Sequence, residues 1–306
     1  MSPSHDSLQA WVGRTEQRDD IASAAQVDAL NALLDHDLPE PRPGDALPPL
    51  AHWLHFTPRA RQGALGGDGH AERGGFLPPV GLPRRMWAGG ELVFHRPLRI
   101  GHAMYRRSRI AALRHTQGRS GALVFVTVEH LLGDAQGLAI TERQDLVFRE
   151  PPLDTQPAPE PQAAPPSGLF SRRIQPDPVL LFRYSALTFN GHRIHYDQPY
   201  ATGVEGYPGL LVHGPLIATL LVDLVQRHWP AATLRRFSFR AMRPLFVPHD
   251  FTVCCAPTEL ATPRTNDSND TTHTASPGAV PNQLNLWARD RDGWLAMQAS
   301  AELSPP

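Results

Sequence analysis

Three polar side chains with a spacing suited to acid–base chemistry lie at Asn190, His192 and His195. A second group, His213–Gly214–Pro215, follows eighteen residues after His195. An imidazole with a pKa near 6.5 can take up and release a proton at neutral pH. The apolar run after Pro215 predicts a helix, whose first backbone N–H groups lack intrahelical partners and favour negative charge. A general base beside such a helix end is suited to chemistry at a thioester carbonyl.

Each of these residues has an expected role, and for several an alternative stays open. His195 is the predicted general base, and Asn190 would position water or the thioester. His192 either supplies a second proton-transfer function or orients His195. Gly214 is the predicted oxyanion donor, because a residue without Cβ lets an oxygen approach its N–H closely; an ordinary helix start is the alternative. His213 either lines the pocket or caps the helix locally.

Further side chains are candidates for substrate binding. Tyr200 and Tyr207 flank the turn before the helix and are predicted to line an acyl or pantetheine channel, with core packing as the alternative. Arg84 and Arg85, close to Trp87, could hold a substrate carboxylate through bidentate pairing, or could be solvated surface arginines.

The composition excludes several kinds of site. With 306 residues, 41% of them apolar, the chain is long enough for one large domain or two domains of about 150 residues. The formal net charge of −1 gives no electrostatic reason to expect nucleic acid or an anionic membrane as a partner. All 29 basic side chains are arginine, so Schiff-base and phosphate-loop lysines are excluded. The adjacent Cys254 and Cys255 cannot supply a disulfide framework or a zinc knuckle, and we expect one of them to point inward.

Targeting signals are absent from the pattern. The N-terminus lacks a charged head followed by an apolar run, and the most apolar stretch, Leu210–Val225, is too short to span a bilayer. We therefore expect a soluble, cytoplasmic protein.

Two globular stretches flank a proline-rich connector. The segment Pro151–Pro166 can form neither a helix nor a strand ladder, so it is predicted to be an extended linker. A polar stretch, Thr262–Asn282, is predicted to be a mobile loop insertion. We divide the chain into an N-terminal unit at 1–150, a linker at 151–168 and a C-terminal unit at 169–306.

The same order of elements is expected in both units. A first helix is predicted whose apolar face is formed by Ile21, Ala24, Val27, Leu30 and Leu34. Two acidic residues, Asp19 and Asp20, would lie in its first turn. Four strand-like runs follow: Glu91–Arg99, Tyr105–His115, Ala122–Leu132 and Leu138–Arg149. In the second unit a strand-like run at Pro178–Thr188 precedes the polar turn, and a helix is predicted from Gly214 to about His228. Four more strand-like runs follow that helix: Leu234–Phe246, Phe251–Leu260, Gln283–Ala288 and Trp294–Leu303. A helix and a four-stranded meander, twice over, indicate two copies of one α+β unit.

Several runs of the sequence resemble the MaoC-like hot-dog hydratases and dehydratases of acyl thioesters, in particular the branch with two fused hot-dog units. The specific runs are Tyr184–Ser–Ala–Leu–Thr–Phe–Asn–Gly–His–Arg–Ile–His–Tyr–Asp and Gly206–Tyr–Pro–Gly–Leu–Leu–Val–His–Gly–Pro–Leu. Weaker matches are Gly75–Phe–Leu–Pro–Pro–Val, Arg85–Met–Trp–Ala–Gly–Gly and Glu142–Arg–Gln–Asp–Leu–Val. The resemblance implies an α+β double hot-dog fold, in which two antiparallel sheets, each wrapped around a central helix, join edge to edge.

The resemblance also implies a hydro-lyase. Its substrate would be a 2,3-unsaturated acyl thioester, branched or dicarboxylic, such as a mesaconyl-C4 or itaconyl ester, or the corresponding 3-hydroxyacyl thioester in the reverse direction. Coenzyme A or an acyl carrier protein would be part of the substrate, with no metal or organic cofactor. The C-terminal unit would carry the catalytic turn, the N-terminal unit would shape the acyl pocket, and a homodimer is compatible with the fold.

One departure from the general hydratase motif matters for the chemistry. That motif reads Asp-x-Asn-Pro-x-His, and alignment of its histidine on His195 puts Asn190 in the aspartate position and His192 in the asparagine position. Asparagine cannot accept a proton at neutral pH. The usual pair of proton-transfer groups is therefore incomplete in this turn.

Three other functions stay open. His195-x-Asp197 with His213 or His228 imitates the facial triad of non-haem iron oxygenases, although the strand pattern of a jelly roll is missing. The lost aspartate allows a non-catalytic acyl-thioester-binding protein. A thioesterase on the same fold would need a carboxylate that activates water at the carbonyl.

Overall fold

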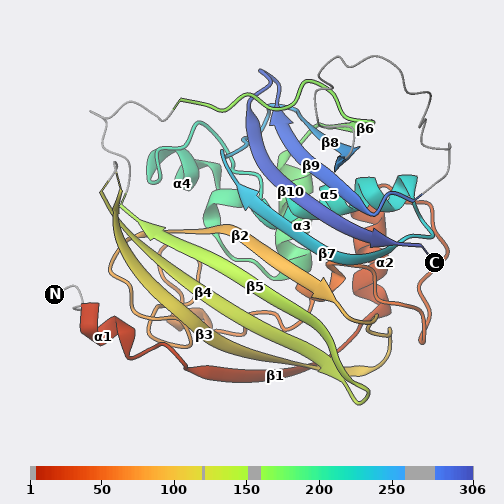
Figure 1. Cartoon of the computed structure of the whole chain (residues 1–306). Coiled ribbons are helices and arrows are strands. Elements are labelled where there is room, and N and C mark those ends of the chain that lie inside the picture. The colour runs from red at the N-terminus through yellow and green to blue at the C-terminus, as the bar shows by residue number, and fades with distance from the viewer. Residues whose placement is uncertain (1–4, 119–120, 151–159, 259–279, 306) are drawn as a thin grey trace, which may run out of the picture.

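The strands form one continuous antiparallel sheet that runs through both halves of the chain. The computed structural model describes residues 5–118, 121–150, 160–258 and 280–305. Within these residues the strand order is β1-β3-β4-β5-β2-β7-β10-β9-β8-β6. The strands of the first half of the chain therefore form one end of the sheet and those of the second half form the other end, as Figure 1 shows. The strands are β1 (Thr15–Ile21), β2 (Arg84–Phe94), β3 (Ala103–Gly118), β4 (Gly121–Asp134), β5 (Gly137–Arg149), β6 (Phe170–Ile174), β7 (Thr233–Ala241), β8 (Phe251–Pro257), β9 (Gln283–Asp290) and β10 (Leu295–Ser304).

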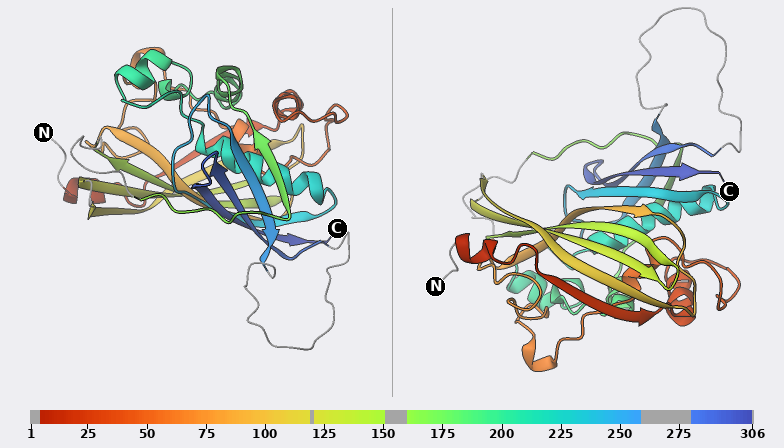
Figure 2. Two further views of the ribbon diagram at one scale, coloured as in Figure 1. Left: turned by 90° about the horizontal axis from the view of Figure 1, so that it is seen from above. Right: turned by 60° about the horizontal axis from the view of Figure 1, so that its bottom comes forward.

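Most helices lie together on one side of this sheet, as the view from above in Figure 2 shows. The helical segments are α1 (His5–Gln9), α2 (Ala24–Leu33), η1 (Ala51–Leu54), η2 (Gln62–Ala64), α3 (Pro178–Thr188), η3 (Arg193–His195), α4 (Gln198–Gly203) and α5 (Gly214–His228). None of the helices in the described part of the chain combines the length and apolar character that a membrane span requires.

The two halves of the sheet meet where β2 pairs with β7. Gly90 pairs with Phe239 and Leu92 with Phe237, and both Leu92 and Phe237 are fully buried. Two glycines allow the close approach: a Cβ on Gly89 would lie 2.6 Å from the carbonyl oxygen of Phe239. One apolar core therefore continues across the junction from one unit into the other.

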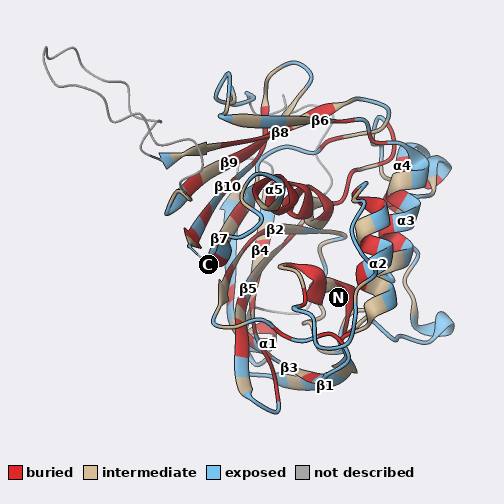
Figure 3. Ribbon diagram, turned by 90° about the vertical axis from the view of Figure 1, so that its right-hand side faces the viewer, coloured by how far each residue is buried: buried red, intermediate tan, exposed pale blue. Residues whose placement is uncertain are grey.

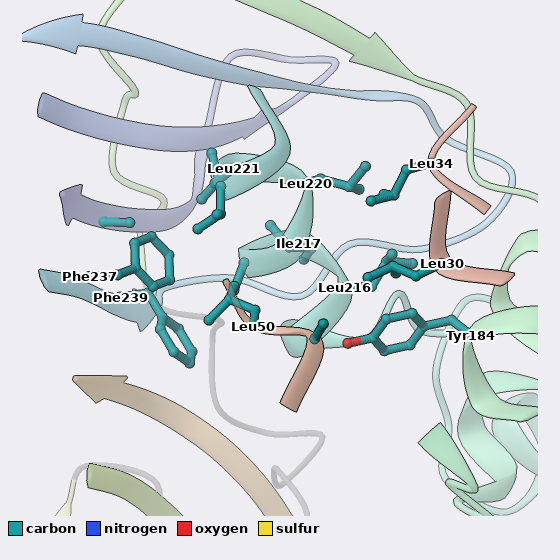
Figure 4. Packing of buried hydrophobic residues seen from close by; sticks show 14 of the residues in the cluster. Leu30, Leu34, Leu50, Tyr184, Leu216, Ile217, Leu220, Leu221, Phe237 and Phe239 are labelled. Carbon is teal, nitrogen blue, oxygen red and sulfur yellow. The ribbon is translucent and has the colours of Figure 1, made fainter. Parts of the chain in front are cut away.

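In the C-terminal unit, α5 is the centre of the core. Its residues from Leu216 to Val225 are all buried, and Figure 3 shows the helix enclosed by β6 to β10. The close view in Figure 4 shows Leu216, Ile217, Leu220 and Leu221 among residues of η1, α2, α3 and β7. Each such aliphatic side chain contributes roughly 1.5–3 kcal/mol when it leaves water, so α5 anchors both units.

One buried carboxylate lies on this helix. Asp223 is 1% exposed and pairs with Arg172 of β6 at 2.7 Å and with Arg227 at 2.9 Å. His36, which follows α2, bonds to its second oxygen. A buried charge with this many partners is stable, and the pairs tie α5 to the edge strand and to the N-terminal unit.

The N-terminal unit differs from this arrangement. α2 contacts α3 and η1, and the inner face of β5 is met by the short η1. His52 and Trp53 of η1 both bond to Glu142 of β5, at 3.0 and 2.9 Å. Where the resemblance predicts a central helix in each unit, the described residues form a long enclosed one only in the C-terminal unit. The N-terminal unit uses η1 and a buried polar contact instead.

Two predicted elements are corrected by the structure. Asp19, Asp20 and Ile21 belong to β1 and not to a helical first turn; Ile21 is 59% exposed, and α2 begins after the N-cap Ser23. The run Pro178–Thr188, predicted as a strand, is the helix α3. The Asp177 side chain accepts a hydrogen bond from the Leu180 N–H, and Pro178 occupies the first turn, where proline needs no hydrogen-bond acceptor.

Other expectations are met in part. The eight other strand-like runs all overlap strands, with two large differences in their bounds. β2 begins at Arg84 and ends at Phe94, so it shares only residues 91–94 with the predicted run, and β7 ends at Ala241, before the predicted Phe246. Both cysteines of β8 are free and buried: Cys255 joins the main core, whereas Cys254 packs with Trp287 and Leu295. Residues 151–159 of the predicted linker and 262–279 of the predicted insertion lie outside the described residues. The rest of the linker contacts the C-terminal unit, since Ala163 forms an isolated bridge with Trp294.

Candidate active site

The polar turn follows α3 directly. Phe189 ends the helix in the left-handed conformation, with φ of 50°, and the Asn190 N–H donates to the Ser185 carbonyl oxygen. The Asn190 side-chain oxygen accepts from the His192 N–H at 3.1 Å. The short η3 then brings His195 to the turn's inner side. The turn is thus bounded by helical segments on both sides.

His195 is held in one tautomer. Its Nδ1 lies 2.7 Å from the Leu211 carbonyl oxygen, and because a carbonyl only accepts, Nδ1 carries the proton. The neutral ring therefore has its lone pair on Nε2. Burial lowers the pKa of His195 to about 4, although the bond to Leu211 opposes this shift. At neutral pH the side chain is an uncharged base.

His213 stacks on the face of the His195 ring. The two imidazoles stack with centroids 3.7 Å apart and an interplanar angle of 16°. His213 Nε2 lies 2.8 Å from the Ser185 Oγ of α3, and burial keeps its pKa well below the usual value. His213 both lines the cavity and precedes α5 as its N-cap residue, but its side chain makes no capping hydrogen bond.

A loop of the N-terminal unit packs against the turn. The Arg193 N–H donates to the Asp68 carbonyl oxygen at 2.9 Å, and the Arg193 guanidinium donates to the Gly67 carbonyl oxygen at 3.0 Å. A Cβ on Gly69 would lie 1.9 Å from the carbonyl oxygen of Gly191, and the φ of Gly69 is +87°. Only glycine fits this contact, so the loop is held closely on the polar turn.

This loop adds a carboxylate and an imidazole to the site. Asp68 Oδ2 accepts from His70 Nδ1 at 3.0 Å, and Oδ1 accepts from the His70 N–H at the same distance. The His70 ring lies 4.1 Å from that of His192, whose ring lies 5.4 Å from that of His195. Three imidazoles thus form a row that ends at Asp68.

The row has uneven electrostatics. Burial lowers the pKa of His192 to about 2, and its histidine neighbours add to the shift. Burial also lowers the pKa of His70, while its hydrogen bond to Asp68 acts in the opposite direction. For Asp68, burial raises the pKa, but the bonds from His70 outweigh it and hold the pKa well below its usual range. Asp68 therefore stays ionised and faces an imidazole.

A cavity of about 1880 Å³ opens beside these side chains. Its lining comes from both units. The N-terminal unit contributes the loop around His70, the start of β2 and the end of β5, and the C-terminal unit contributes the polar turn and the N-terminus of α5 at Gly214. A Cβ on Gly214 would meet nothing nearer than the Trp87 carbonyl oxygen at 4.0 Å. The first N–H groups of α5 have no intrahelical partner, so an anionic oxygen in the cavity can bind there.

The two neighbouring arginines of β2 differ in their partners. Arg84 pairs with Glu205 at 3.2 Å and lies over the Tyr207 ring. Arg85 also lines the cavity, and no hydrogen bond or ion pair of its side chain is found among the described residues. Burial lowers the pKa of Arg85 to about 10, in spite of the nearby Asp68. Arg85 is thus a partly desolvated cation inside the cavity.

Most of the predicted site residues line this cavity. Those that do are Arg85, Trp87, Asn190, His192, His195, Tyr207, His213 and Gly214. Tyr200 is different: it is buried on α4, where its hydroxyl donates to Glu205 and Arg193 covers its ring. The expected place of Tyr200 in a substrate channel is therefore wrong, because packing of the turn occupies that side chain.

One group of metal-ligand type is present in the described ranges. Asp68, His70 and His192 have ligand atoms within 4.8 Å of one another. The charge of Arg85 acts on all three side chains and opposes a second cation there. The alternative triad of His195 and Asp197 is not assembled, because His195 Nδ1 bonds to Leu211 while Asp197 pairs with Arg193. His228 stacks on Phe170 at the other end of α5.

Sequence reasoning missed Asp68 and His70. The local signal is weak: an Asp-Gly-His within the glycine-rich run Gly66–Gly75. The contact with the catalytic turn spans more than a hundred residues and depends on the packing of Gly69. Ser185 was part of the recognised run, but its role under His213 depends on α3 being a helix.

Comparisons with known proteins agree with this architecture. Residues 50–247 match the family model of hydroxyacyl-thioester dehydratase type 2. Mesaconyl-C(4)-CoA hydratase of Chloroflexus aurantiacus is 51% identical over 238 residues, which cover 78% of this chain and 84% of the relative. Among solved structures, a MaoC-like dehydratase of Phytophthora capsici has a TM-score of 0.64 at 13% identity, covering 99% of this chain and 100% of the other.

A Mycobacterium tuberculosis protein described as a double hotdog fold has a TM-score of 0.59 at 14% identity, with 99% of each chain covered. The structural likenesses establish the double hot-dog fold, and the family model and the C. aurantiacus relative establish the kind of chemistry. The chain therefore belongs to the hydroxyacyl-thioester dehydratase type 2 family and is a double hot-dog hydro-lyase of acyl thioesters.

Proposed function

We propose that this hydro-lyase hydrates a 2,3-unsaturated acyl-CoA thioester whose acyl group carries a free carboxylate, as a mesaconyl-C4 or itaconyl thioester does. The observation that carries this substrate class is Arg85. It is a cation in the cavity for which no ion pair is found in the described ranges, although the charge of Asp68 acts on it, and it lies next to an arginine that is already paired. A substrate carboxylate would bind it with two parallel hydrogen bonds. The identity to mesaconyl-C(4)-CoA hydratase supports the same class.

In this proposal His195 and Gly214 act at opposite ends of the reacting system. The Nε2 of His195 removes a proton from the water that attacks C3, a role supported by its fixed tautomer and by a ring that is neutral at pH 7. The Gly214 N–H and the start of α5 stabilise the enolate oxygen. Asn190 holds the turn through its bond to the His192 N–H and presents its amide to the cavity.

The N-terminal unit shapes the acyl pocket. Trp53 and Trp87 line the cavity and contact each other edge to face, with ring centroids 5.0 Å apart. Together with Arg85 they place a positive group beside an apolar surface, which suits a short dicarboxylic acyl chain. The cavity exceeds the 300–1,000 Å³ common for small ligands, which leaves room for the pantetheine arm.

The remaining features of the proposal come from the sequence. The acid–base groups of this chain supply the proton transfers, so we propose no metal or organic cofactor. Coenzyme A as the carrier, a homodimer and a cytoplasmic location also stay predictions.

The test compares substrates with and without the carboxylate. Loss of enoyl absorbance is followed for mesaconyl-C4-CoA, itaconyl-CoA and crotonyl-CoA, with wild type, Arg85→Gln and Arg84→Gln. Loss of the Arg85 pair should cost about 2 kcal/mol, roughly a thirtyfold increase in KM for the dicarboxylic esters. Crotonyl-CoA should change little.

Arg84→Gln is the matched control, because that guanidinium already has a protein partner. Its effect should be the same on all three esters. An equal loss for crotonyl-CoA and mesaconyl-C4-CoA in Arg85→Gln would contradict the carboxylate assignment. Release of free thiol in place of hydration would contradict the reaction.

A further inference from the structure

The catalytic turn holds one clear base, His195, and asparagine where the general motif has its second proton-transfer group. Hydration needs two such groups, one for the attacking water and one for C2. His192 is a poor second group by itself, since its buried position keeps the ring neutral. The missing function has to come from a side chain that lines the same cavity.

His70 is in that position. It lines the cavity on the loop that packs against the turn, and its Nδ1 is held by Asp68. Because a carboxylate only accepts, Nδ1 carries a proton, and Nε2 is the atom free to gain or lose one. No hydrogen bond of Nε2 is found among the described residues.

The loop is rigid enough to place such a group. The Gly66 N–H donates to the His70 carbonyl oxygen at 2.8 Å, Leu65 forms a bridge with Ala71, and Gly69 fits against Gly191 with no room for a Cβ. Both carboxylate oxygens of Asp68 are engaged by His70. Asp68 is therefore a positioning residue, and the imidazole is the reactive group.

We propose that His70, oriented by Asp68, is the second proton-transfer residue of the reaction and is supplied by the N-terminal unit in place of the aspartate that the catalytic turn lacks. This inference rests on the proposed function, with His195 as the base for water. The protein would then share one active site between its two units, and not confine the chemistry to the C-terminal one.

Each proton of the proposed step has a donor and an acceptor. In hydration, His195 Nε2 takes a proton from water while the water oxygen bonds to C3. The electron pair of the double bond moves toward the thioester oxygen. His70, whose protonated form the Asp68 carboxylate stabilises against the effect of burial, gives its Nε2 proton to C2. The proton gained by His195 and the proton lost by His70 are then exchanged with water in the cavity that both rings line, which restores the starting state. In the reverse direction, His70 removes the C2 proton and His195 protonates the leaving hydroxyl.

A change of leaving group separates the two histidines. Elimination from a 3-hydroxyacyl-CoA requires both groups, because hydroxide leaves only when it is protonated. Elimination from the 3-chloroacyl-CoA needs only removal of the C2 proton, since chloride departs with its electron pair unaided. We expect His195→Gln and His70→Gln each to lose about a hundredfold in kcat on the hydroxy substrate. For His195→Gln, the ratio of its kcat to that of wild type should be at least tenfold higher on the chloro substrate than on the hydroxy substrate. For His70→Gln this ratio should not rise.

Asp68→Asn should follow the His70 pattern with a smaller loss in kcat and little change in KM. His36→Gln is the matched control: it removes another histidine bonded to an aspartate, outside the cavity, and should leave turnover unchanged. Melting temperatures show whether each variant is folded. If His70→Gln is unfolded, Asp68→Asn gives the same test, because it too should fail to recover on the chloro substrate.

Wild-type turnover of the hydroxy substrate by folded His70→Gln would overturn the inference and leave the proposed function intact. Recovery of His70→Gln on the chloro substrate, or equal impairment of His195→Gln and His70→Gln on that substrate, would also overturn it. No elimination by the wild-type protein from any 3-hydroxyacyl-CoA would instead contradict the proposed function.

Discussion

The two units use the same kind of sheet for different purposes. In the C-terminal unit, β6 to β10 enclose α5, whose residues from Leu216 to Val225 are buried. In the N-terminal unit the inner face of β2 and β5 is only partly covered, by η1, and the rest lines the cavity. Where the C-terminal unit has an apolar core, the N-terminal unit therefore has part of the cavity.

The polar residues follow the same division. Asp223 on α5 is paired with two arginines and a histidine that hold elements together. Asp68 bonds to one histidine that faces the cavity. The same residue types therefore link structural elements in one region, whereas in the other, where a cavity lies beside them, they form the proposed proton-transfer group.

The substitution with the largest expected effect on turnover is His195→Ala. Removal of the base should lower kcat/KM for hydration at least about a hundredfold. Steady-state kinetics with wild type and variant on the same enoyl-CoA ester measure this loss. A melting curve shows whether the variant stays folded without the ring that stacks on His213. Unchanged turnover would show that the chemistry does not depend on the C-terminal unit's turn.

Gly69→Ala tests the contact between the units. A methyl group there would lie 1.9 Å from the Gly191 carbonyl oxygen, and φ of +87° is unfavourable for alanine. The loop must shift, so we expect a loss of about tenfold in kcat by misplacement of His70. In the control Gly67→Ala, the new Cβ has nothing within 4 Å and no unfavourable φ, and activity should be retained. Equal activity of the two variants would argue that the units work independently.

Glu142→Gln should affect stability more than turnover. Burial by itself would raise the pKa of Glu142, but bonds and charges from His52 and His130 lower it to about 2, from 4.5. A carboxyl group with a lowered folded-state pKa contributes stability above pH 4.5 that is lost as the pH falls toward 2. Glu142→Gln should therefore be less stable at neutral pH and lose less stability in that window. Denaturant unfolding between pH 3 and 7 measures both; parallel curves for wild type and variant would contradict the assignment.

Much of the C-terminal site follows from local sequence. The positions of His195 and Gly214 depend on a short turn and a helix start, both of which are encoded by neighbouring residues. The strands were predictable because apolar residues alternate along them. The helix α3 was not, because an eleven-residue apolar segment suits a strand or a helix, and the cap formed by Asp177 and Pro178 decides between them.

The contribution of the N-terminal unit could not be predicted in the same way. Asp68 and His70 lie in a loop with no periodic pattern, and their place beside His192 depends on the fit of Gly69 against Gly191. The difference between Arg84 and Arg85 likewise depends on Glu205, which is distant in sequence. Long-range packing, which no short pattern encodes, fixed these residues in the site.

The central claim is that this double hot-dog site hydrates a carboxylate-bearing enoyl thioester. The most direct measurement follows mesaconyl-C4-CoA with the wild-type protein, with enoyl absorbance and free thiol read in parallel. The account predicts loss of absorbance without thiol release, at a rate at least about a hundredfold lower in His195→Ala. Thiol release at the rate of absorbance loss, or no turnover of this ester with ready turnover of crotonyl-CoA, would contradict it.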